Sequence, residues 1–85
     1  MRKAILCIHD IKGERYIQPH TAETVAIAIR DFKEECTKTD NPSVLTKYKE
    51  DYNLIHTGWF DESTGKVETI NPEIVTQGKH YVIEQ

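Results

Sequence analysis

The sequence lacks the features that mark several classes of protein. It has no stretch near the roughly 18 consecutive apolar residues of a membrane-spanning helix, and no apolar run is longer than Ala4-Ile5-Leu6-Cys7-Ile8. It also lacks a surplus of positive charge, because 11 basic residues face 14 acidic ones, a net charge of -3. Proteins that coat nucleic acid are usually strongly basic. We therefore expect a soluble protein that does not enter a membrane and stays in the cytoplasm of the cell that makes it.

Motifs for cofactors, metals and catalysis are missing as well. None of the four glycines belongs to a Gly-rich loop that opens a helix, so a P-loop or Rossmann nucleotide site is not indicated. The four histidines and two cysteines show no zinc-ligand spacing. Cys7 lies in the apolar run and Cys36 at a helical core position, which predicts buried free thiols in a reducing compartment. We predict no enzyme activity, no cofactor and no metal.

The 85 residues are expected to form a single domain, 1–85, with a small core. Residues 4–8 predict a buried strand, and residues 15–18 predict a second strand that ends at Pro19. A helix is predicted from an N-cap at Thr21 to near Thr37. Its apolar stripe is Ala22, Val25, Ala26, Ile29, Phe32 and Cys36.

The second half of the chain predicts one helical turn near residues 44–48 and then a strand hairpin. Residues 52–60 and 67–70 are the strands, Gly65 takes the left-handed position in the turn, and Asn71-Pro72 ends the second strand. Strict alternation places Ile55 and Trp59 on one face of the first strand, opposite Leu54, His56 and Phe60. The tail, residues 71–85, is expected to pack on the sheet or to pair with a partner chain.

These elements predict an α+β fold in which one amphipathic helix packs on a small, mainly antiparallel sheet. The order is strand, strand, helix, strand, strand and tail. The sheet face away from the helix must then be polar, covered by the tail, or used for dimerisation.

Two surfaces are candidates for binding. Pairs of cations and aromatic rings suit single-stranded DNA, because every base can stack and every nucleotide carries a charge. The candidate residues for DNA contact are Arg15, Tyr16, Lys47, Tyr48, Lys49 and Lys66. Apolar residues of the sheet and tail suit a protein interface, with Ile55, Trp59, Tyr81 and Val82 as candidates.

Ordered short motifs along residues 5–78 resemble a known family. They are Glu50-Asp51-Tyr52, then Gly58-Trp59-Phe60-Asp61 and Thr64-Gly65, preceded by the helix segment 28–32 and followed by the Pro72–Gly78 segment. This set is similar to the small non-structural protein of microviruses, the single-stranded DNA phages of the gokushovirus and chlamydiaphage type. The sequence departs from that family at His20, where the family often has Phe after Pro, and in a longer loop between helix and strand.

The resemblance implies a phage non-structural protein that assists viral DNA replication, the switch to single-stranded DNA synthesis, or packaging. Its expected partners are single-stranded DNA and phage or host replication proteins, and its expected location is the host cytoplasm. It brings no catalytic residues. The alternative is a homodimeric protein-interaction module that engages a host or phage protein without binding DNA.

Overall fold

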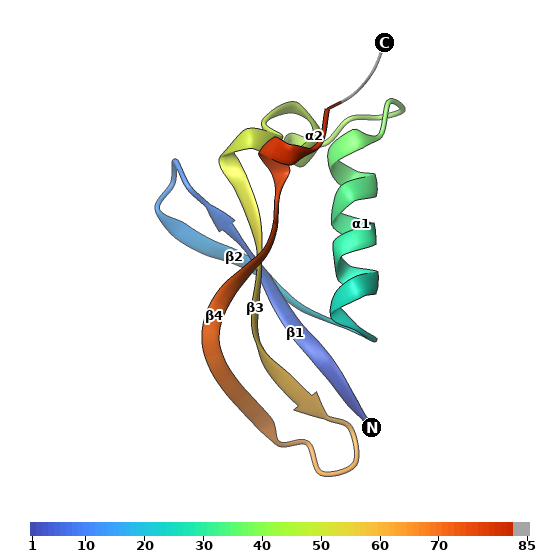
Figure 1. The fold of residues 1–85 in the computed structure, drawn as a ribbon, viewed down its shortest axis with the longest axis vertical. Coiled ribbons are helices and arrows are strands. Elements are labelled where there is room, and N and C mark those ends of the chain that lie inside the picture. Colours follow the sequence, from blue (N-terminus) through green and yellow to red (C-terminus); the bar gives the residue numbers. More distant parts are fainter. Residues whose placement is uncertain (83–85) are drawn as a thin grey trace.

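The computed structural model describes residues 1–82, which form a four-stranded antiparallel sheet with one long helix against it (Figure 1). In chain order the elements are β1 (Arg2–Asp10), β2 (Arg15–Ala22), α1 (Val25–Thr37), α2 (Val44–Lys47), η1 (Lys49–Asp51), β3 (Tyr52–Asp61), β4 (Val67–Gln77) and η2 (Gly78–His80). The spatial order is β2-β1-β3-β4. The α+β class is confirmed, and the sheet is its larger part. None of the helices in residues 1–82 has the length and apolar character needed to cross a bilayer.

β1 lies inside the sheet, as its continuous apolar run predicts. Ala4, Leu6 and Ile8 point to the α1 side and belong to the main core cluster, in which Leu6 is fully buried. Cys7 points to the opposite side and is also buried. Both cysteines are buried free thiols, as expected.

α1 begins three residues later than the sequence predicts. Thr24 is the N-cap, since its hydroxyl accepts a hydrogen bond of 3.1 Å from the backbone N–H of Ile27. The predicted cap, Thr21, still belongs to β2. Ala28, Phe32 and Cys36 recur every four residues and form the buried face, whereas Ala26, assigned to the stripe, is exposed. The helix ends at Thr37, as predicted.

Both edge strands continue through a proline at which the sequence predicts their end. β2 bulges around Pro19, because Leu6 pairs with His20 and Ile8 pairs with Ile17, and Gln18 there has a φ of 53°. β4 bulges around Pro72, because His56 pairs with Glu73 and Gly58 with Thr69. An edge strand needs no amide hydrogen bond on its outer side, so it tolerates proline at a bulge. The first part of the predicted tail, residues 71–77, is therefore strand paired with β3.

A further bulge in β3 changes which side chains share a face. Ile5 of β1 pairs with Gly58 and Leu6 pairs with His56, so Thr57 is an extra residue. Directly paired residues point to the same side of a sheet. Trp59, paired with Ala4, therefore lies on the α1 side and packs against the core. The prediction that Trp59 shares a face with Ile55 is wrong, because a one-residue insertion reverses the alternation.

The chain turns are where local chemistry places them. Gly65 has a φ of 75° in the β3–β4 turn, as predicted. Residues 44–47 form the expected helical turn, α2, with Ser43 and Thr46 as a capping box. The Thr46 hydroxyl donates a 2.8 Å hydrogen bond to the carbonyl oxygen of Glu35 and so joins α2 to α1.

Candidate functional site

Five of the six candidate DNA-contact residues lie toward one end of the sheet. The β1–β2 turn and α2 are both at the upper end in Figure 1, and the β3–β4 turn is at the lower end. The β1–β2 turn is joined to η1, which follows α2, because the backbone N–H of Ile11 donates to the carbonyl oxygen of Asp51 at 2.9 Å. Lys12 Nζ also lies 3.9 Å from Asp51 Oδ2. Arg15 and Tyr16 therefore belong to the same end as the segment 47–49.

Tyr16 is the aromatic side chain best placed to receive a base at this end. Its ring stacks on the His9 ring with centroids 4.5 Å apart and an angle of 16° between the planes. The residue is nevertheless 60% exposed, because β2 is an edge strand. A rigid, exposed aromatic ring at a sheet edge is a surface on which a nucleobase can stack. Arg15, the preceding residue of β2, pairs with Asp10 and points to the other side of the sheet.

Two of the cations of this end are already held by oxygen atoms of the same chain. Arg15 Nε lies 3.5 Å from Asp10 Oδ2, and Lys49 Nζ donates to the carbonyl oxygen of Thr46 at 3.4 Å. Lys47 is exposed, and Tyr48 is 56% exposed. Lys47 and the rings of the two tyrosines are therefore more available to a ligand than Arg15 or Lys49.

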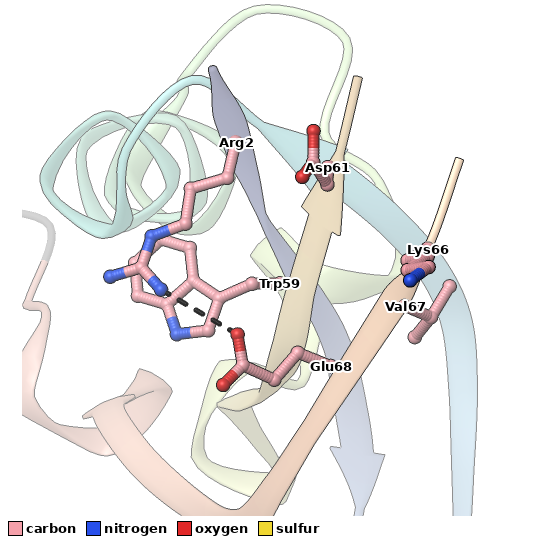
Figure 2. A pocket seen from close by; sticks show the side chains of 6 residues that line it. All are labelled: Arg2, Trp59, Asp61, Lys66, Val67 and Glu68. Carbon is pink, nitrogen blue, oxygen red and sulfur yellow. Dashed lines mark ion pairs between the residues drawn. The ribbon is translucent and has the colours of Figure 1, made fainter. Parts of the chain in front are cut away.

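Lys66 lies at the opposite end, in a molecule whose longest dimension is 46 Å. It lines a surface hollow of about 330 Å³ with Arg2, Trp59, Asp61, Val67 and Glu68 (Figure 2). The structure therefore does not bring the six DNA candidates together on one surface.

The hollow around Trp59 has an aromatic wall and balanced charge. The Arg2 guanidinium carbon stands 3.9 Å from the Trp59 ring centroid, and Nη1 of Arg2 is 3.8 Å from Glu68 Oε2 (Figure 2). A hydrogen bond from the Ser63 backbone N–H lowers the pKa of the Asp61 carboxyl. Two carboxylates beside two cations leave no net positive field, so the hollow is a poor phosphate site.

The four candidate interface residues are separated from one another by the fold. Ile55 is on the uncovered side of the sheet but only 3% exposed, while Trp59 is on the α1 side. Tyr81 packs edge-on against Phe32 of α1, and its hydroxyl pairs with that of Thr76. Val82 is 75% exposed. The four do not form one surface, and Tyr81 serves the core of its own chain.

His56 is a buried polar residue that sequence reasoning did not single out. It is 4% exposed, and its Nε2–H donates to the carbonyl oxygen of Gly58 at 3.0 Å across the β3 bulge. The ring meets Trp59 edge-on with centroids 4.8 Å apart, and its Nδ1 is 3.6 Å from Glu73 Oε1. No sequence signal marks it, because its partners are set by the bulge.

Thiol chemistry and metal binding find little support in the geometry. Burial raises the pKa of the Cys7 thiol and raises that of Cys36 to about 11. A nucleophilic cysteine needs a lowered pKa in an electropositive cleft. Within residues 1–82, no three His, Cys, Asp or Glu side chains are grouped as metal ligands.

Comparison with known proteins finds one family. Residues 3–81 match the family described as Phage ORF5 protein. The chain is 33% identical over 72 residues to a protein named Protein ORF5 from Chlamydia phage 1. The aligned region covers 81% of this chain and 74% of that relative. No solved structure matches the chain.

Proposed function

The chain belongs to the phage ORF5 protein family, small proteins of chlamydiaphage-type microviruses, and from this premise we propose that it is a non-structural DNA-handling factor. It assists viral DNA replication, the switch to single-stranded DNA synthesis, or packaging, by binding single-stranded DNA in the host cytoplasm. It works by binding and not by catalysis. The observation that carries this proposal is the exposed Tyr16 ring, which stacks on His9 at the edge of the sheet.

The mode of binding follows from the chemistry of that end. A base stacks on Tyr16, and exposed Lys47 at the same end of the sheet supplies a cation for the phosphate backbone. Stacking on one aromatic ring is worth about 1–3 kcal/mol per base. Each phosphate contact releases counterions, so affinity falls as salt rises, with a slope of roughly -0.7 per contact for a single strand. The acidic surroundings make this a weak, short-footprint site.

The first test measures fluorescence anisotropy of a labelled deoxythymidine oligonucleotide titrated with protein at two salt concentrations. We expect binding that weakens with salt, and a dissociation constant about tenfold higher for Tyr16→Ala, since 1.4 kcal/mol is a factor of ten. Lys47→Glu should weaken binding, whereas Lys66→Glu, the same charge change at the opposite end, should leave it nearly unchanged. Absence of binding at low salt, or equal effects of the two lysine variants, would contradict the proposal.

The alternative function is a homodimeric protein-interaction module that engages a phage or host protein without DNA. The observation that favours it is Ile74, an apolar residue that is 53% exposed on the sheet face opposite α1. No anisotropy change at low salt, together with sedimentation that depends on protein concentration, would favour this alternative over the first proposal.

A further inference from the structure

We propose that the sheet face opposite α1 is the contact between two copies of this chain. This rests on the protein-interaction alternative and names its first partner. Strand pairing places Ile5, Tyr16, Phe60, Val67 and Ile74 on that face, since each lies in a register row that points away from Ala4, Leu6 and Ile8. We call these five residues the open face.

The open face is accessible in the single chain. Tyr16, Val67 and Ile74 are 60%, 58% and 53% exposed, while Ile5 and Phe60 are half-buried. Figure 1 shows α1 on the other side of the sheet and the turns at its two ends. Tyr16, Val67 and Ile74 are therefore in contact with water in the monomer, whereas Cys7 and Ile55 on the same side of the sheet are buried.

The small number of charged residues on this side of the sheet favours a second copy of the chain as the partner. Lys3 is the only Lys, Arg, Asp or Glu that the strand register places on this side, and it lies in the last row, 3.3 Å from Glu23 Oε1 and 3.6 Å from Glu62 Oε2. In the whole chain 29% of the residues are charged, and the net charge is -3. A two-fold contact places like residues near like. Two acidic copies therefore repel least where the shared surface carries few charges and its one lysine is paired with carboxylates.

The same lack of charge disfavours DNA as the occupant of the open face. A single strand needs cations along its backbone, and Lys3 is already paired with two carboxylates. Only Tyr16, at the edge strand, is common to the open face and the proposed DNA site.

The size of the face is adequate for a weak dimer. Four strands about 4.8 Å apart and about eight residues long at 3.3 Å each give roughly 500 Å² per copy, or roughly 1,000 Å² in total. This is near the lower limit for a specific interface. Two sheets packed face to face would lie about 10 Å apart, with Ile74 of each copy inserted against the other sheet. The expected dimer is therefore dependent on concentration.

Sedimentation velocity over about a hundredfold range of protein concentration tests the proposal. The mass should rise from 9.9 kDa toward twice that value. Ile74→Glu should raise the dimer dissociation constant at least about tenfold, because it buries a charge in the contact. The matched control is Val44→Glu on α2, which is 58% exposed and lies off the open face, so it should leave the dimer intact.

Three further measurements distinguish loss of the dimer contact from loss of folding, and distinguish a second copy from DNA as the partner. Circular dichroism checks that Ile74→Glu is folded, and Val67→Glu, near the β3–β4 turn, is a second variant of the open face. A wild type that stays monomeric at every concentration overturns the dimer, as does equal weakening by Val44→Glu. If single-stranded DNA dissolves the dimer and Ile74→Glu weakens DNA binding, DNA is the occupant and the proposal fails. If the dimer binds DNA without dissociating, the proposed contact stands and only the alternative in which the protein binds no DNA is rejected.

Discussion

Cys36 has no exposed surface, and its thiol lies on the buried side of α1. Burial disfavours the thiolate and raises the pKa to about 11. The folded chain therefore holds this proton at a pH where the unfolded chain has already lost it. The contribution to stability is complete below pH 9 and disappears as pH rises through the window from about 9 to 11.

We expect the free energy of unfolding to fall across that window, with about 2–3 kcal/mol of the loss due to Cys36. The measurement is urea unfolding followed by circular dichroism at a series of pH values. Cys36→Ala is the control, since it is less stable throughout but loses the titrating group, so its fall between pH 9 and 11 should be smaller. Identical slopes in the two proteins would show that this thiol does not control alkaline stability.

At the scale of the element, α1 shows how two similar residues take different roles. Thr21 and Thr24 are both suitable N-caps by residue type. Thr21 belongs to β2 and pairs with Ile5 of β1. Thr24 has extended backbone angles, and its hydroxyl accepts the hydrogen bond from the backbone N–H of Ile27. The partner strand therefore determines where the helix begins.

Thr24→Ala should lower the free energy of unfolding by about 0.5–2 kcal/mol, because it leaves a helix N–H without its partner. Thr21→Ala removes the same atoms from an exposed strand position and should change stability by less than about 0.5 kcal/mol. Denaturant titration of both variants compares them. The assignment of the helix start is wrong if Thr21→Ala is the more damaging of the two.

For the whole molecule, Phe32 joins elements that are distant in sequence. It is 5% exposed in the cluster with Leu6 and Leu54 of the sheet, and it meets Tyr81 edge-on at 6.3 Å between centroids. Helix, sheet and the segment after β4 therefore share one contact. A domain of 85 residues has a total stability of only about 4–13 kcal/mol.

Phe32→Ala should cost about 3–5 kcal/mol and leave a marginally folded or unfolded chain. Phe60→Ala deletes the same ring from the half-buried open face and should cost clearly less when measured at a concentration where the chain is monomeric. Thermal unfolding followed by near-ultraviolet circular dichroism distinguishes them. Equal losses would mean that the core is not organised around α1.

The spacing of residues along the chain is sufficient to predict those parts of the fold that depend only on residues close in sequence. The sequence predicts the buried helix positions Phe32 and Cys36, the apolar β1 and the left-handed Gly65, because helix and strand periods and backbone sterics are local. The ordered motifs around residues 50–65 also lead to the family to which the chain belongs.

Pairing between distant strands determines the rest. The extra residue Thr57 moves Trp59 from the open face to the α1 side, and bulges carry β2 and β4 past Pro19 and Pro72. The same topology places Lys66 at the end of the sheet away from Tyr16. A bulge or register is set by the partner strand, whose position no local period encodes. The residue types of the candidate site can therefore be predicted from the sequence. Which of these residues share a surface is decided by tertiary contacts.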